Sequence, residues 1–455
     1  MSGLNEIRVL SPCGGLGYGF PLDSLEHGLR KNPHVIGVDA GSTDPGPYYL
    51  GAGKTILSWD AQKRDLEHLL AARHSLDIPL LIGTAGGSGT KPLLTRTIEI
   101  IRQISREKGF TFKLASITAD IDKQRLKQDL KAGRVRSFEM KKELTPAAID
   151  NSRHIVAQMG MEPYLEALAN GADVIVAGRS YDPAVIAALP LQQGFDSGLA
   201  IHMGKILECG AAAAEPGGIA DCMLGTLRRD HFVLEPLNPE RRCTTASVAA
   251  HSLYEKDSPV HLLLPGGMLD LNAACFEELD DRTVRVSGSK FIPSDTYTIK
   301  LEGAEQVGFR SIFIAGVRDP LLISRIDTVI EFVQDAVARA LPYAPGEDYR
   351  LLFRVYGKNG VMGAWEPEQE SIGHELGIVG EVVGASSRIA ASVCSYARGA
   401  MLHYHYSGRK ATAGNLAFPY SPSDIDMGAV YNFSIYHLLE IDEPTEPFTI
   451  SYEQV

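Results

Sequence analysis

Short apolar runs in the first half of the chain each end in a loop of glycine or polar residues, and this repeated pattern constrains the fold most. Strands are expected at 35–39, 79–83, 113–118 and 172–178, and helices between them at 61–75, 92–108 and 152–170. Strands that alternate with helices indicate an α/β fold, with a mostly parallel sheet covered by helices. Ligands of such folds bind beyond the carboxyl ends of the strands, so the loop residues are the candidates for a site.

The alternation of expected strands and helices changes near residue 225. With 455 residues the chain exceeds what one hydrophobic core usually organises. Runs of β-branched and aromatic residues at close spacing follow the change and indicate antiparallel strands beside helices. We therefore expect an α/β domain at 1–225, a C-terminal α+β domain at 226–440, and an acidic, proline-containing tail or arm at 441–455.

Charge and composition exclude several classes of protein. The 44 basic and 56 acidic residues give a net charge of −12 without a basic stripe, which argues against nucleic acid as the main partner. No apolar run approaches the roughly 18 residues of a membrane span, and the N-terminus lacks a secretory pattern. The six cysteines have no paired spacing, as expected in a reducing compartment. These features predict a cytoplasmic protein that does not bind a membrane.

The loop after the expected strand 35–39 is the first candidate for a ligand site. It carries Asp39 and Asp44 among several glycines and prolines. Ordering glycines costs entropy and prolines remove backbone donors, so folding gains little from such a loop. We expect it to hold a ligand, with Ser42 and Thr43 among the residues that bind substrate.

A glycine-rich turn near the N-terminus resembles a dinucleotide-binding loop. The turn contains Gly15 and Gly17, and Asp39 follows about 20 residues on, where an acid that binds ribose is expected. The spacing Gly-x-Gly-x-x-Gly is absent in every register, because Phe20 and Leu22 stand where the third glycine is needed. A helix N-terminus that binds a carboxylate or phosphate is therefore the more general expectation.

A second glycine-rich loop, 83–91, resembles a phosphate loop but lacks its spacing, since Pro92 follows Lys91. Its backbone donors are expected either to form an anion-binding nest beside one cation or to make only a tight turn. The substrate-binding candidates here are Thr84, Gly86, Gly87 and Ser88.

Carboxylates at the strand ends suit magnesium or manganese, which prefer oxygen ligands. The metal candidates are Asp44, Asp120 and Asp122. The pair Asp120 and Asp122 is equally typical of a helix cap. Without a metal, neighbouring carboxylates raise one another's pKa and suit acid or base catalysis, with Asp39 and Asp182 as candidates. We expect Asp39, Thr84, Asp120 and Arg179 to meet around one pocket.

Later segments supply positive charge and further polar groups. Helical spacing across 201–214 predicts that His202, Lys205 and Cys209 share one face, although a buried histidine beside a partly exposed lysine is equally expected. Arg241 precedes an expected helix, and we expect it either to bind a substrate carboxylate or to bridge two domains. Arg179, Ser180 and Tyr181 follow the strand 172–178 and are expected to bind substrate.

The long aromatic loop 404–425 contains another candidate, Asn415. Loops of this length in a compact domain are usually functional, so we expect either a lid or an arm to another subunit. The arm would fit a homo-oligomer, and an interface role for the aromatic residues is the simpler alternative.

Several long motifs resemble the acyclic terpene utilisation protein family, AtuA. They lie at 37–51, 178–183, 202–210 and 411–419, and the resemblance spans most of the chain. It implies a role in catabolism of branched acids and acyl-CoA esters and, for some members, a small separate partner protein. The resemblance favours an enzyme and names no reaction, because a fold does not define chemistry.

These residues favour a lyase that adds or removes water across a carbon–carbon double bond of a small polycarboxylate or acyl-CoA thioester. The expected roles are base for Asp39 or Asp182, acid for Lys205 or His202, and carboxylate binding for Arg179 and Arg241. A non-catalytic subunit that binds a carboxylate or CoA ester is the alternative, and an NAD-dependent oxidoreductase is the third.

Overall fold

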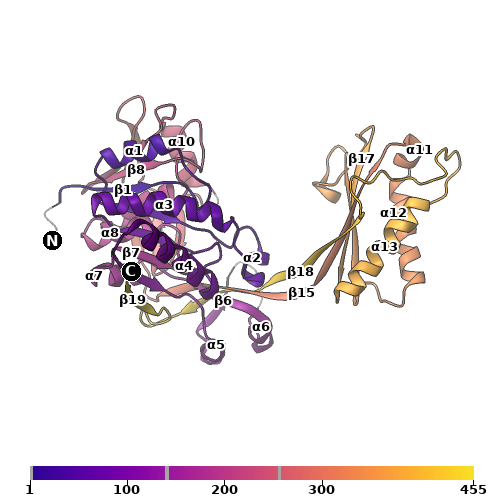
Figure 1. Cartoon of the computed structure of the whole chain (residues 1–455), viewed down its shortest axis with the longest axis horizontal. Coiled ribbons are helices and arrows are strands. Elements are labelled where there is room, and N and C mark those ends of the chain that lie inside the picture. Colours follow the sequence, from indigo (N-terminus) through magenta and orange to yellow (C-terminus); the bar gives the residue numbers. More distant parts are fainter. Residues whose placement is uncertain (1–3, 139–142, 255–257) are drawn as a thin grey trace. The chain divides into compact units, whose positions relative to one another are not determined.

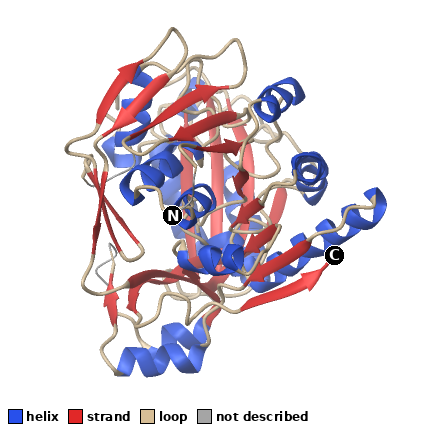
Figure 2. Ribbon diagram, turned by 90° about the vertical axis from the view of Figure 1, so that its left-hand side faces the viewer, coloured by secondary structure: helices blue, strands red, loops and turns tan. Residues whose placement is uncertain are grey.

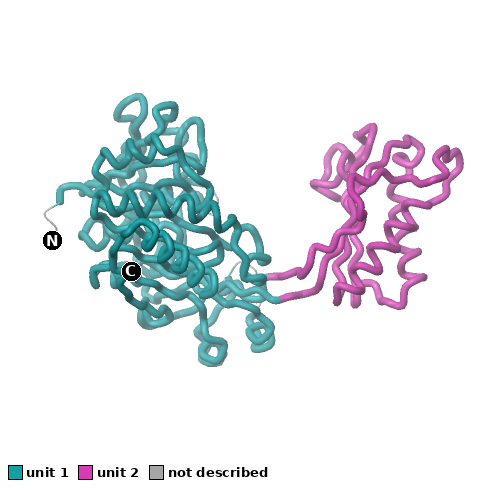
Figure 3. Tube along the Cα trace, in the orientation of Figure 1, with its two compact units in different colours: residues 1–305, 433–455 teal, residues 306–432 magenta. Residues whose placement is uncertain are grey.

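The chain forms two compact units in the computed structural model, which describes residues 4–138, 143–254 and 258–455. One unit consists of residues 1–305 and 433–455, and the other of residues 306–432 (Figure 3). The chain enters the second unit within strand β15, Thr298–Val317, and leaves it within strand β18, Asp424–Glu440. The second unit is therefore an insertion into a unit built from both ends of the chain.

A ten-stranded sheet in the order β12-β13-β9-β8-β1-β2-β3-β7-β4-β19 forms the centre of the first unit (Figure 1). Its middle strands are parallel: β1 Ile7–Ser11, β2 Val35–Asp39, β3 Leu80–Gly83, β7 Val174–Ala177 and β4 Lys113–Ile117. The strands expected from the apolar runs are all among them. This part of the sheet confirms the α/β fold.

Antiparallel strands extend the sheet on both sides. They are β8 Met223–Leu227, β9 His231–Pro236, β13 Val284–Ser287, β12 Cys275–Glu278 and, at the opposite edge, β19 Ile450–Gln454. Because β8 pairs directly with β1, the sheet continues across residue 225 and the structure differs from the expected domain boundary there. Residues 441–455, expected as a tail or arm, include β19, which pairs with β4.

Helices cover both faces of this sheet (Figure 2). Adjacent strand residues such as Val9 and Leu10 belong to two different hydrophobic cores, as expected where both faces are covered. One core packs helices α7 Glu162–Ala169, α8 Ala184–Gln192 and α9 Ser197–Leu207, and the other packs α1 Leu22–Arg30, α3 Trp59–Leu76 and α4 Lys91–Lys108. Helix α4 buries Leu94, Ile98 and Ile101 at helical spacing and ends at Gly109 with a φ of +71°.

Smaller elements complete the first unit. Strands β10 His261–Leu264, β11 Gly267–Asp270 and β14 Lys290–Pro293 form a three-stranded antiparallel sheet. Strand β5, Val135–Ser137, pairs with β18. The remaining helices are α2 Pro47–Ala52, α5 Lys123–Lys131, α6 Pro146–Asn151 and α10 Thr245–Leu253.

The helix expected at 152–170 is wrong in its first half. Residues Ser152–Gln158 form strand β6, which pairs antiparallel with β15, and only α7 is helical. Ile155 and Val156 favour a strand once a partner strand is present, and that partner lies far along the chain.

The second unit, residues 306–432, is an α+β unit, whereas residues 226–305 of the expected α+β domain belong to the first unit. Its strands are β16 Tyr349–Tyr356, β17 Leu376–Gly384 and the adjoining parts of β15 and β18. Its helices are α11 Pro320–Ile323, α12 Ile326–Ala340 and α13 Ser387–His403, with a short 3₁₀ turn at Gly363–Trp365. Apolar side chains of α12, α13 and the strands share one core. In the part of the chain that the structure describes, every helix is too short or too polar to cross a membrane.

Candidate active site

A cavity of about 240 Å³ lies beyond the carboxyl ends of β2 and β7. This is where a parallel sheet is expected to bind ligands. Its carboxyl, amino and thiol groups are those of Asp39, Asp44, Asp182, Lys205, Glu208 and Cys209. The structure therefore brings together three of the four expected catalytic residues, Asp39, Asp182 and Lys205, from distant parts of the chain.

Asp39 is the last residue of β2 and is almost fully buried, with 8% of its surface exposed. Its Oδ2 accepts a hydrogen bond of 3.1 Å from the backbone N–H of Gly41. Its buried Oδ1 has no partner among the residues that the structure describes. Burial, and next the charge of Asp182, raise the pKa of Asp39 well above its usual value, although Arg179 opposes the shift. Asp39 therefore holds a proton to higher pH than an ordinary aspartic acid.

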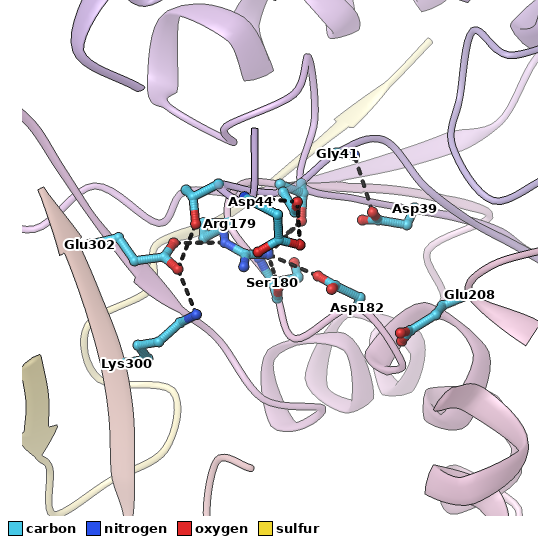
Figure 4. A network of polar contacts seen from close by, with 12 residues as sticks. Asp39, Gly41, Asp44, Arg179, Ser180, Asp182, Glu208, Lys300 and Glu302 are labelled. Atoms are coloured by element: carbon cyan, nitrogen blue, oxygen red, sulfur yellow. Dashed lines mark hydrogen bonds and ion pairs between the residues drawn. The ribbon is translucent and has the colours of Figure 1, made fainter. Parts of the chain in front are cut away.

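A chain of buried ion pairs holds Asp182 in position (Figure 4). The Arg179 guanidinium is 1% exposed, and it donates to Asp182 over 2.8 Å and to Glu302 over 2.8 Å. Lys300 pairs with Glu302 over 2.8 Å, and Thr43 donates to the same carboxylate. Burial alone would raise the pKa of Glu302, but Arg179 and Lys300 lower it to about 2. Arg179 thus orients Asp182 instead of binding a substrate carboxylate as expected.

Lys205 and Glu208 form a second ion pair at the end of α9. Burial, and then the nearby Asp182, raise the pKa of Glu208 to about 8, although Lys205 opposes the shift. Burial would lower the pKa of Lys205, but the pairing with Glu208 raises it, so the ammonium keeps its charge. The Cys209 thiol lies 3.6 Å from the Tyr254 hydroxyl, and burial raises its pKa to about 12. This pKa makes Cys209 a poor nucleophile.

The glycine-rich loop that follows β3 packs closely against the loop that follows β2. A Cβ on Gly41 would lie 2.3 Å from the carbonyl oxygen of Gly87, so these backbones approach too closely for any side chain. Thr84 and Ser88 are fully buried. The Thr84 hydroxyl accepts from the backbone N–H of Ser180 over 3.3 Å. The expected substrate-binding residues Thr84, Gly86, Gly87 and Ser88 therefore lie outside the cavity lining, in a tight structural turn.

The N-terminal glycine turn is occupied by a carboxylate of the protein itself. Asp65 accepts from the backbone N–H of Gly17 over 2.8 Å and from that of Gly19 over 3.0 Å. These two donors are therefore not available to the phosphate of a nucleotide. Gly15 differs, because it lines the cavity.

His202 was expected as an acid, but the structure places it in the core. Its ring nitrogens lie 2.6 Å from the hydroxyl of Ser289 and 3.0 Å from that of Ser252. Its ring also packs at right angles on Phe232. Helical spacing predicted that His202 and Lys205 share one face of α9. In the structure His202 contacts serines of the core, whereas Lys205 lines the cavity.

Other expected residues also have structural partners. Arg241 donates to Asp221 over 2.6 Å. Asp120 accepts from the backbone N–H of Lys91 over 2.7 Å, away from the cavity lining. Asp122 caps α5 by accepting from the backbone of Arg125, as the alternative to a metal ligand predicted.

The remaining candidates fall into three environments. The Ser42 hydroxyl donates to Asp44 over 2.8 Å, and both line the cavity. The Ser180 hydroxyl lies 2.7 Å from that of Tyr164, whereas Tyr181 lines a different cavity. Asn415 belongs to the second unit, where its amide donates to the carbonyl of Tyr404 over 2.8 Å. Among the residues described, no group of three or more His, Cys, Asp or Glu is arranged to hold a metal ion.

Sequence reasoning missed two acidic residues that define the site. Glu208 lies three residues after Lys205, a spacing typical of an ion pair on a helix, and this signal was available. Glu302 has no such local signal, because its partner Arg179 lies 123 residues earlier in the chain.

Fold and cavity together define an α/β protein with a carboxylate-lined site at the carboxyl edge of its parallel strands. The model of the acyclic terpene utilisation family AtuA matches residues 60–221 and 231–392, which is more than half of the chain. The chain therefore belongs to this family. No curated protein and no solved structure matches it significantly.

Proposed function

We propose that this protein is a lyase that adds or removes water at a carbon–carbon double bond next to the carbonyl group of a small acyl thioester or carboxylic acid. The observation that carries the proposal is the pair of carboxyl groups in one cavity with different environments. Asp39 is buried with a raised pKa, whereas Asp182 accepts a hydrogen bond from a guanidinium. Two such groups are suited to an acid and a base respectively.

In the direction of water loss, Asp182 removes the proton from the α-carbon. The electrons of that C–H bond form the double bond, and the β-carbon loses its hydroxyl. Asp39 gives its proton to this hydroxyl, which leaves as water. Lys205 faces the same cavity and would stabilise the negative charge that develops on the carbonyl oxygen. Hydration is the reverse of these steps.

The size and charge of the cavity favour a small substrate with little negative charge. Its 240 Å³ lie below the range of roughly 300–1,000 Å³ that is common for ligand pockets. Lys205 is the single cation among the described lining residues, beside four carboxyl groups. Arg179 and Arg241 are engaged elsewhere. An acyl thioester or monocarboxylate therefore fits better than a polycarboxylate, with the bulk of a CoA group outside the cavity.

A magnesium or manganese ion remains a prediction for this cavity, through Asp44, which faces it. A small partner protein, a homo-oligomer and a cytoplasmic location also remain predictions. The alternative function, a non-catalytic subunit that presents a carboxylate or CoA ester to a partner enzyme, uses the same cavity without proton transfer.

Proton NMR of turnover tests the proposal. The purified protein, with and without Mg²⁺, is incubated with a panel of short 2-enoyl and 3-hydroxyacyl thioesters. We expect conversion of at least one pair, and a loss of about 100-fold or more in Asp39→Asn because a positioned acid contributes about that much. Asp77→Asn is the matched control, since Asp77 is exposed and asparagine tolerates its positive φ.

Two outcomes would contradict the proposal. Full activity in Asp39→Asn would remove the assigned acid. Thermal stabilisation by a thioester without any conversion would favour the non-catalytic subunit instead, since binding to the native state alone raises stability.

A further inference from the structure

A second cavity of about 410 Å³ lies in the first unit and has a different character. Its walls come from the three-stranded sheet β10-β11-β14 and from parts of β5, β6, β15 and β18. The apolar residues that dominate them include Phe138, Leu262, Leu264, Met268 and Ile292. An apolar cavity of this size is typical of a site for a small organic ligand.

The charged side chains among the described residues of the cavity wall are all positive. No described residue that lines it is an aspartate or glutamate, whereas Arg136 and Lys300 both contribute. Lys300 is already neutralised by Glu302 at 2.8 Å. Arg136 is exposed, and its side chain makes no ion pair or hydrogen bond with the residues that the structure describes. Among the described residues, the apolar cavity is therefore bordered by one positive charge whose side chain has no partner.

We infer that this cavity binds an amphipathic anion, namely a medium-chain aliphatic carboxylate, with its chain on the apolar wall and its carboxylate on Arg136. A guanidinium matches the planar carboxylate with two parallel hydrogen bonds. A fully polar anion would leave the apolar wall without a partner, and a neutral hydrocarbon would leave Arg136 without one. The inference does not depend on the proposed lyase reaction, because this site shares no lining residue with the acidic cavity.

Calorimetric titration of the full-length protein with decanoate tests the inference. We expect saturable binding of decanoate, weaker binding of decanol, which lacks the charge, and no binding of acetate, which lacks the chain. Arg136→Gln should raise the Kd about tenfold, the loss of roughly one charge-assisted contact. Arg106→Gln, an exposed arginine on α4, is the matched control and should bind as the wild type does.

A second variant tests where the alkyl chain of decanoate binds. Met268→Trp fills the cavity and should abolish decanoate binding, while Asp39→Asn in the acidic cavity should leave it unchanged. Equal affinity in the wild type, Arg136→Gln and Met268→Trp would overturn the inference. Loss of decanoate binding in Asp39→Asn with retention in Arg136→Gln would also overturn it, because the ligand would then occupy the acidic cavity. These titrations measure binding and not turnover, so they can fail or succeed independently of the proposed lyase activity.

Discussion

Four carboxyl groups line the acidic cavity, whereas none of the described residues that line the apolar cavity is acidic. Burying several carboxyl groups together is unfavourable, and such clusters concentrate where proton transfer needs a perturbed pKa. An apolar wall beside a cation that has no partner among the described residues needs no perturbed pKa and provides affinity instead. This contrast favours proton transfer in the acidic cavity and ligand binding in the apolar cavity.

One ion-pair chain reaches both cavities. Asp182 lines the acidic cavity, Lys300 lines the apolar cavity, and Arg179 and Glu302 connect them through buried contacts of 2.8 Å. Both sites therefore depend on the same buried charges for their shape. Single substitutions can therefore separate this shared support from the properties of each cavity.

The largest effect on stability is expected from Glu302→Gln. The substitution removes the shared partner of Arg179 and Lys300 and leaves buried positive charge uncompensated. Breaking a buried ion pair in this way costs about 3–5 kcal/mol. Urea unfolding measures the loss, with Glu440→Gln on exposed surface as the matched control. Equal stability of the two variants would mean that the ion-pair chain does not support the two cavities.

His202→Gln should lower stability without changing the chemistry of the acidic cavity. Removing a buried partner of two serine hydroxyls costs about 1–3 kcal/mol. Thermal melts measure that loss, and proton NMR of the folded variant should give a turnover within about twofold of the wild type. A loss of turnover as large as that of Asp39→Asn would return His202 to the role of acid.

Glu208→Gln should change how stability depends on pH. Unfolded Glu208 loses its proton near its ordinary pKa of 4.5, whereas folded Glu208 holds it to about 8. The folded state binds more protons between these values, so this group makes the free energy of unfolding fall as pH rises through that window, by up to about 1.4 kcal/mol per pH unit. Urea titrations across the window should show this slope in the wild type relative to Glu208→Gln. Parallel pH profiles would contradict the raised pKa.

Asp122→Ala should have the smallest effect, a loss of about 1 kcal/mol from a helix cap. If Mg²⁺ stabilises the wild-type protein in thermal melts, Asp122→Ala should retain that shift, and Asp44→Asn in the acidic cavity should lose it. The opposite pattern would make Asp122 a metal ligand.

Local patterns in the sequence predicted the centre of the fold. The apolar runs that end in glycine or polar loops are the parallel strands, and their carboxyl ends bring Asp39 and Asp182 together. The edges of the sheet depend on partners far along the chain. β6 needs β15 to become a strand, and β19 needs β4, so neither was predicted from its own residues.

The residues of the site also divide into those that local sequence patterns predict and those that depend on distant contacts. Lys205 was found because it lies near other polar groups on one short segment, and Glu208 was within reach of the same reasoning. Glu302 and Lys300 lie on a strand whose place beside Arg179 follows only from the tertiary fold. Glycines were the least specific signal, because backbone packing and Asp65 explain two of the three glycine-rich loops.

The protonation state of Asp39 is the property on which the assigned chemistry depends most directly. Infrared difference spectroscopy of the wild type and Asp39→Asn at neutral pH measures it through the carbonyl stretch of a protonated carboxylic acid. We predict a band in the wild type that is missing from Asp39→Asn and disappears as the pH is raised. Identical spectra of the two proteins in this region would show that Asp39 is already ionised at neutral pH, and the acid of the proposed reaction would be lost.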